Sequence, residues 1–220
     1  MPDQLVAILP ELWTAFLQTA LMLGIGLIAA LVIGGPLGVL LFLFSDGQAL
    51  HNRKLALVLG WFVNTVRSFP FIILMVALVP ITRSLAGTSI GPLAAAVPLS
   101  FAAIPYFARL VEQNLRDVPR GVIEAAQAMG ASELQIVLRV LLPEARAALV
   151  LSLTVLAISF LSYSAVAGVV GGGGIGDLAI RYGYYRFETD VMVLTVVILV
   201  ALVQLIQLTG TRLARRLDKR

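Results

Sequence analysis

The sequence contains no cysteine and a single histidine, His51. The absence of cysteine excludes disulfides, thiolate metal sites and cysteine nucleophiles. His51 lies in a polar loop beside Asp46 and Asn52, where a solvated histidine is expected. No G-x-x-x-x-G-K-[ST] sequence occurs, so the chain does not bind a nucleotide through a Walker loop. No histidine, cysteine or carboxylate pair forms a catalytic set, and the sequence does not predict an enzyme.

Charged residues are also scarce. They make up 13% of the 220 residues, whereas hydrophobic residues make up 60%, and this balance indicates a membrane protein. A helix needs roughly 20 apolar residues to cross a hydrocarbon core about 30 Å thick. The uncharged runs predict an all-α integral membrane protein with one transmembrane domain over 1–220. Its five expected spans lie at about 12–44, 62–83, 90–112, 146–170 and 189–211.

Arg67 makes the second span ambiguous, because it divides two short apolar runs. A charge at the centre of a bilayer costs roughly 2.5 to 3.5 kcal/mol. We favour an interpretation in which Leu55–Val66 lies partly along the cytoplasmic interface, with Trp61 as an anchor, and the crossing starts near Arg67. The alternative is a single tilted span from which Arg67 snorkels.

Basic residues are absent from the first 52 positions, which predicts an N-terminus outside the cytoplasm. Most of the 16 basic residues lie on segments that five-span alternation assigns to the opposite side. These residues are Arg53, Lys54, Arg109, Arg116, Arg120, Arg139, Arg146, Arg212, Arg215, Arg216, Lys219 and Arg220. The positive-inside rule makes that side, and the C-terminus, cytoplasmic. The net charge of +4 is therefore a topology signal and gives no reason to expect nucleic acid as a partner.

Small and polar residues within the spans give weaker signals. Gly34-Gly35-Pro36 predicts a break in the first span, and Gly34 with Gly38 forms a small-xxx-small packing pair. In the fourth span Ser152, Ser159 and Tyr163 share one helix face. Such a stripe faces protein or a water-filled path, which makes Ser159 and Tyr163 candidate pathway residues. The alternative is that the serine hydroxyls bond back to their own helix.

Residues 171–177 read Gly-Gly-Gly-Gly-Ile-Gly-Asp and match G-x-G-x-x-G by letter. The dinucleotide-binding fingerprint requires a preceding strand within a soluble βαβ unit, and here a membrane helix precedes the glycines. The sequence therefore predicts a mobile or tightly turned external loop rather than a nucleotide site.

Residues 117–143 form a polar segment between two spans. Pro119 suits the first turn of a helix, Gly130 suits its end, and Ser132 with Gln135 forms a capping box that starts a second helix. An amphipathic helix in this place lies on the membrane or docks into a groove of another protein. Glu124 and Glu133 leave it without a cationic face for anionic lipid, which favours docking.

The same segment carries a family resemblance. Glu124-Ala125-Ala126, Gly130, Val140 and Leu142-Pro143 resemble the EAA loop of bacterial ABC importer permeases, in which Val140 is usually isoleucine. Other segments are similar in sequence to the family of methionine (D-methionine) importer permeases. They are Arg67–Leu74, Gly87–Gly91, Tyr163–Ala165, the glycine loop and Arg181–Tyr184. This similarity extends over nearly the whole chain.

The resemblance implies a type I importer permease fold in the bacterial cytoplasmic (inner) membrane. It implies a homodimer that works by alternating access, with two ATP-binding cassette subunits and a substrate-binding protein as partners; ATP and Mg bind to the ATPase. The docking residues it implies on the coupling helix are Glu124, Ala125, Ala126, Met129 and Gly130.

Other functions stay open at this point. An ABC permease for a different small solute has the same features. A secondary transporter of small hydrophobic amino acids is expected to show internal repeats and acidic residues within the spans. We find no repeat, and no Asp or Glu lies within the uncharged runs from which the spans are predicted.

Overall fold

Every regular element in residues 2–46 and 50–218, the part that the computed structural model describes, is helical. The elements are α1 (Pro2–Ala29), η1 (Ala30–Gly34), α2 (Gly35–Phe44), α3 (Arg53–Ser68), α4 (Phe71–Ala77), α5 (Val79–Ala86), α6 (Pro92–Arg116), α7 (Arg120–Ala128), α8 (Glu133–Ile136), η2 (Val137–Leu141), α9 (Leu142–Ala167), η3 (Gly168–Gly172), α10 (Gly174–Leu178), η4 (Ala179–Tyr185) and α11 (Thr189–Leu217), in which η marks a π-type segment.

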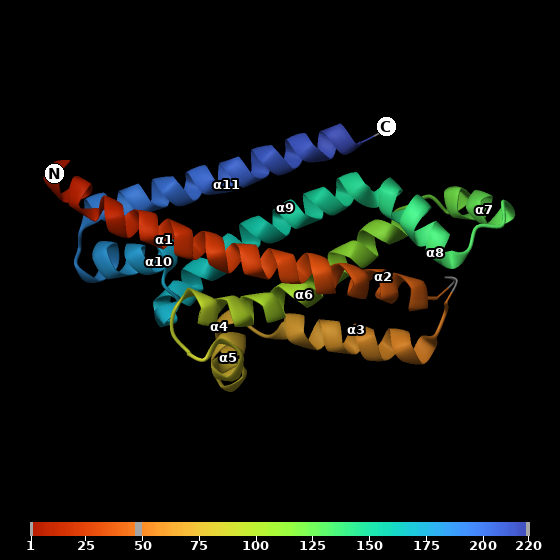
Figure 1. The fold of residues 1–220 in the computed structure, drawn as a ribbon, viewed down its shortest axis with the longest axis horizontal. Helices are drawn as coiled ribbons and strands as arrows, with labels where there is room; N and C mark the ends of the chain where they lie inside the picture. Colours follow the sequence, from red (N-terminus) through yellow and green to blue (C-terminus); the bar gives the residue numbers. More distant parts are fainter. Residues whose placement is uncertain (1, 47–49, 219–220) are drawn as a thin grey trace.

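The long helices run side by side along one axis (Figure 1). Helix α6 contacts α1, α2, α3 and α9 and lies at the centre of the bundle. In the most apolar 18-residue stretch of α6, 56% of the residues are buried, whereas the share is 11% in α11 at the edge of the bundle. The N-terminus and α10 lie at one end of the long axis, and α7 and α8 lie at the other.

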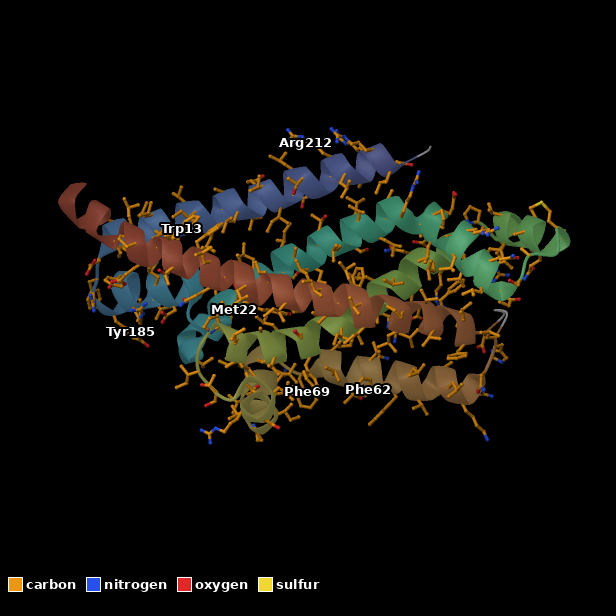
Figure 2. All side chains as sticks on the ribbon, viewed as in Figure 1. Trp13, Met22, Phe62, Phe69, Tyr185 and Arg212 are labelled. Atoms are coloured by element: carbon orange, nitrogen blue, oxygen red, sulfur yellow. The ribbon has the colours of Figure 1, made fainter. Side chains whose placement is uncertain are left out.

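Large apolar side chains cover much of the outer surface (Figure 2). Trp13 and Phe62 are exposed and point away from the bundle, whereas Met22 is fully buried within it. Such a surface in water would be an aggregation site, and hydrocarbon is the solvent that suits it.

Four helices of the described chain are long and apolar enough to span a membrane, and a fifth candidate is a bent pair. The four are Ile8–Phe44, Pro92–Arg116, Glu133–Gly172 and Thr189–Leu217. They overlap the expected first, third, fourth and fifth spans, and each extends beyond its expected span at one end or at both, because the helices continue into the polar flanks. The positions at which the bilayer begins and ends stay predictions.

The expected helical span over 62–83 is not continuous, and here the structure corrects the sequence interpretation. Helix α3 already begins at Arg53 and packs lengthwise beside α2 and α6, so Leu55–Val66 runs along the bundle rather than across its end. At Phe69 the backbone is extended, and α4 leaves α3 at 103°. Proline disfavours the helical conformation in the residue before it, and Pro70 therefore ends α3.

Two further prolines are accommodated without a break, each by a preceding π-helical turn. Pro36 and Pro143 each follow a π-helical turn, η1 and η2, and the flanking helices stay continuous. The N–H of the residue before each proline donates five residues back, Gly35 to Ala30 O and Leu142 to Val137 O. Proline has no backbone N–H to donate, and the wider π-turn accommodates it within a continuous helix. The expected break at Gly34-Gly35-Pro36 is thus a π-turn, and α8 joins α9 through Pro143.

The Gly34 and Gly38 pair packs the first span against α6. A Cβ atom on Gly34 would lie 2.6 Å from Ile104 O, and one on Gly38 would overlap Ala108 O and the side chain of Val111. Only glycine allows the two backbones to approach this closely. The packing role predicted for this pair is confirmed.

Candidate functional site

Helix α7 projects from the end of the bundle opposite to the N-terminus (Figure 1). Pro119 precedes its first turn and its carbonyl accepts from Val122 N–H at 3.1 Å. The inner side of α7 packs on η2 through Ala126, which shares a buried cluster with Ile136 and Val137. The helix is therefore seated on the start of the long α8–η2–α9 element.

Gly130 turns the chain between α7 and α8 in a Schellman motif. Its φ is +79°, Gly130 N–H donates to Gln127 O at 2.9 Å, and Ala131 N–H donates to Ala126 O at 3.1 Å. A Cβ there would meet nothing within 4 Å, so glycine is needed for the backbone conformation and not for space. The expected capping box follows, with Ser132 N–H donating to Gln135 Oε1 at 2.9 Å.

The candidate docking residues divide between two sides of α7. Glu124, Ala125, Gly130 and Met129 are exposed, and Met129 is 82% exposed. Ala126 differs from the expectation, because it is only 4% exposed and contacts its own chain. Its small side chain lets α7 lie close to η2, and it does not offer a surface to a partner.

At the other end of the bundle the glycine segment is tightly turned. Gly171, Gly173 and Gly174 all have positive φ. Two side chains of α1 hold the segment: Gly174 N–H donates to Gln18 Oε1 at 2.8 Å, and Ile175 N–H donates to Thr19 Oγ1 at 3.0 Å. The segment contacts α1 and α9, and the N–H groups of Gly174 and Ile175 are used within the chain.

Replacing Thr19 by valine tests this anchor. Valine keeps the shape of threonine but leaves the buried Ile175 N–H without its acceptor, which costs about 1 to 3 kcal/mol. We expect the purified protein to unfold at a lower temperature in detergent. Thr209→Val is the matched control, because that exposed hydroxyl only donates to carbonyls of its own helix; an equal loss in both variants would contradict the anchor.

Polar groups also cluster beside the glycine segment. Tyr182 Oη donates to Glu11 Oε2 at 2.7 Å, and this hydrogen bond raises the pKa of Tyr182 above its usual value. The Arg186 guanidinium lies 4.3 Å from the centre of the Tyr182 ring, and Arg181 pairs with Asp177 at 2.8 Å. These contacts tie the start of α1 to η4.

A buried carboxylate that the sequence interpretation overlooked lies near the α7 end of α6. Glu112 is 3% exposed and pairs with Arg109 and Arg116 on its own helix. Arg109 Nη2 also donates to Asn64 Oδ1 of α3 at 2.8 Å. The sequence signal that predicts this cluster is the spacing of the two arginines, three residues before Glu112 and four residues after it on one helix face. Glu112 lies within the helix that forms the third span, so an acidic residue is present there after all, held between two arginines.

Removing this carboxylate is expected to be costly. Breaking a buried ion pair by losing one partner destabilises proteins by about 3 to 5 kcal/mol. Glu112→Leu should therefore lower the melting temperature clearly more than Asp177→Asn, which removes the more exposed pair with Arg181. Thermal unfolding of the two variants in one detergent makes the comparison, and equal shifts would show that the triad does not stabilise α6.

The candidate pathway residues lie on α9 at the middle of the bundle. The Tyr163 ring stacks on Phe71 of α4, with centroids 4.8 Å apart, and meets Phe160 edge to face at 5.0 Å. Ser159 is half-buried one turn earlier on the same helix. Ser152, further along the stripe, accepts from Asn114 Nδ2 of α6 at 2.8 Å. Ser152 and Tyr163 therefore face protein, one of the two surroundings expected for a polar stripe in a span.

Among the described residues no group of three or more metal-ligating side chains comes together. The chain has a projecting helix at one end of the bundle and a hydrogen-bonded glycine turn at the other. Polar and aromatic side chains lie between them. This arrangement suits a channel or transporter subunit.

Comparisons with known proteins agree. The family model for the binding-protein-dependent transport system inner membrane component matches residues 22–220. The chain is 49% identical to the probable D-methionine transport system permease protein MetI of Vibrio cholerae, over 95% of this chain and 93% of that protein. It is 43% identical to the methionine import system permease protein MetP of Bacillus subtilis, over 96% of each chain.

A solved structure is similar over the whole fold. It describes inward-facing conformations of the MetNI methionine ABC transporter, with a TM-score of 0.94, 44% identity, and coverage of 97% of this chain and 99% of that one. The chain therefore belongs to the family of binding-protein-dependent transport system inner membrane components, as a permease subunit and not an enzyme.

Proposed function

We propose that this chain is the permease subunit of an ATP-driven importer for methionine or a closely related amino acid. The observation that carries the proposal is the projecting helix α7, which bears the EAA sequence in a chain without a Walker loop. A helix offered to a partner, in a chain that cannot bind ATP through such a loop, fits a transporter whose ATPase is a separate protein. The names of full-length relatives supply the substrate.

The proposed assembly is two copies of this chain, two ATP-binding cassette subunits and a substrate-binding protein, in the bacterial inner membrane. Each chain offers one docking helix, and an ATPase dimer with two-fold symmetry needs two. The N-terminus lies at the opposite end of the bundle from α7, which supports an external N-terminus with α7 and the C-terminus in the cytoplasm. The basic residues gathered on the segments around α7 and at the C-terminus favour the same orientation.

Alternating access follows from the way α7 is connected. ATP binding closes the ATPase dimer and moves both α7 helices. Because α7 packs on η2, and α8, η2 and α9 form one helical element over Glu133–Gly172, the movement reaches Ser159 and Tyr163 in the middle of the bundle. The extent to which nucleotide shifts the equilibrium between the two bundle arrangements is set by its difference in affinity for them.

Uptake by the reconstituted complex tests this function. Proteoliposomes contain this chain with its ATPase, the binding protein is added on the side opposite to the ATPase, and radiolabelled L-methionine is followed. We expect accumulation that requires ATP hydrolysis and is inhibited by unlabelled methionine more strongly than by other amino acids. Uptake that proceeds without ATP, or a preference for an unrelated solute, would contradict the proposal.

Titration of the binding protein with individual amino acids gives an independent test of the substrate. Methionine is expected to bind most tightly, in its L or D form. Tightest binding of an unrelated amino acid, or binding of none, would leave the permease role intact but overturn the assignment of methionine.

A further inference from the structure

Arg67 lies at an unusual depth for a charged residue. It is in the last turn of α3, and with a rise of 1.5 Å per residue it lies roughly 21 Å along the helix from Arg53. Since α3 runs lengthwise beside α2 and α6, most of this distance is depth in a hydrocarbon core about 30 Å thick. A guanidinium at that depth is costly unless it faces protein or water, and an intramembrane charge therefore marks a functional position.

No carboxylate neutralises this arginine within residues 2–46 and 50–218. The ion pairs found there involve other residues, and Arg67 takes part in none of them. The contact that it makes is with an aromatic ring, since its guanidinium carbon lies 5.5 Å from the centroid of Tyr106. The arginine is exposed on the single chain, and its charge is still available to an anion.

Aromatic side chains of three further helices converge beside it. Tyr106 of α6 meets Phe160 of α9 edge to face at 6.3 Å, and Phe160 meets Tyr163, which stacks on Phe71 of α4. We call Arg67 with these four rings the Arg67 cluster. It lies where α3 bends into α4 and where α6 and α9 pack, so a change in the packing of α9 alters its shape.

We propose that the Arg67 cluster is a transient binding site for the substrate in the translocation path. The Arg67 guanidinium pairs with the substrate carboxylate, and the rings of Tyr106 and Tyr163 contact its side chain. A guanidinium offers a planar fork of donors that matches a carboxylate, and thioether sulfur packs favourably on aromatic rings. This inference rests on the proposed function, because it takes an amino acid as the transported molecule.

Substitutions at Arg67 in the complete reconstituted transporter test the site. The measured quantity is L-methionine imported per ATP hydrolysed, which a general folding defect does not lower selectively. Loss of one charge-assisted pairing should reduce this ratio about ten-fold or more in Arg67→Gln and Arg67→Met. Arg67→Lys keeps the charge but not the planar fork, and its coupling ratio should fall between those of the wild type and the two uncharged variants. Arg83→Gln, an exposed arginine on α5, is the matched control and should behave as the wild type.

The outcomes separate the two proposals. A wild-type transporter that imports no methionine overturns the proposed function. A wild-type transporter that imports methionine, with Arg67→Gln and Arg67→Met at its coupling ratio, overturns the Arg67 site alone, as does an equal loss in Arg83→Gln. If Arg67→Gln does not assemble, the Lys and Met variants decide: an active lysine variant with an inactive methionine variant supports the site, and equal impairment of both contradicts it.

Discussion

Ala125→Trp should abolish ATP-driven uptake while the chain still inserts into the membrane. Ala125 lies on the exposed part of α7, so an indole there does not disturb the bundle but holds the helix away from a partner surface. Close approach of two helices or of a helix and a groove depends on small side chains at the contact. We expect uptake to fall about ten-fold or more, which corresponds to about 1.4 kcal/mol of lost coupling.

Ala125→Ser is the matched control for this prediction. It changes the same exposed position by one oxygen atom and should leave uptake close to the wild-type rate. Co-purification of the ATPase with each variant shows whether docking is lost. Normal uptake by Ala125→Trp would show that this side of α7 does not contact the ATPase.

Gly38→Ala should destabilise the bundle, whereas the same change at Gly24 should not. An added Cβ on Gly38 overlaps the backbone of α6 at Ala108, and backbone atoms cannot move aside as a side chain can. Overpacking of this kind costs about 1 to 3 kcal/mol. At Gly24 nothing lies within 4 Å of the added atom, and a better helix former in a helix interior stabilises by up to about 1 kcal/mol.

Thermal unfolding of the two variants in detergent measures this difference. A loss of 3 kcal/mol lowers Tm by roughly 6 to 12 °C in a chain of this size. We expect a fall of that order or smaller for Gly38→Ala and no fall for Gly24→Ala. Equal Tm values for the two variants would mean that α2 and α6 can separate without cost.

The sequence predicted those features that depend on residues near one another in the chain. Long apolar runs located four of the helices, and the turn at Gly130 with the Ser132 capping box follows from local hydrogen bonds. The Gly34 and Gly38 pair was also visible, because glycines four residues apart mark one face of a helix.

Features that depend on tertiary contacts were not predicted. Glu112 is buried in the bundle, its partner Arg109 reaches Asn64 of α3, and Thr19 meets Ile175 across 156 positions of the chain. The bend after α3 has a local signal in Pro70, whereas the cost of a charge in hydrocarbon favoured an interfacial Leu55–Val66. The structure differs, because α3 packs lengthwise in the bundle and Arg67, in its last turn, contacts Tyr106.

The absence of native cysteine allows the docking of α7 to be measured directly, since each introduced cysteine is the only one in the chain. Met129 and Phe187 are 82% and 84% exposed, on α7 and at the opposite end of the bundle. In membranes that contain the assembled transporter, a short cross-linker with one thiol-reactive and one photoreactive end should join Met129→Cys to the ATPase and leave Phe187→Cys unlinked to it. An adduct from Phe187→Cys, or none from Met129→Cys, would contradict the assignment of α7 as the helix that couples ATP hydrolysis to transport.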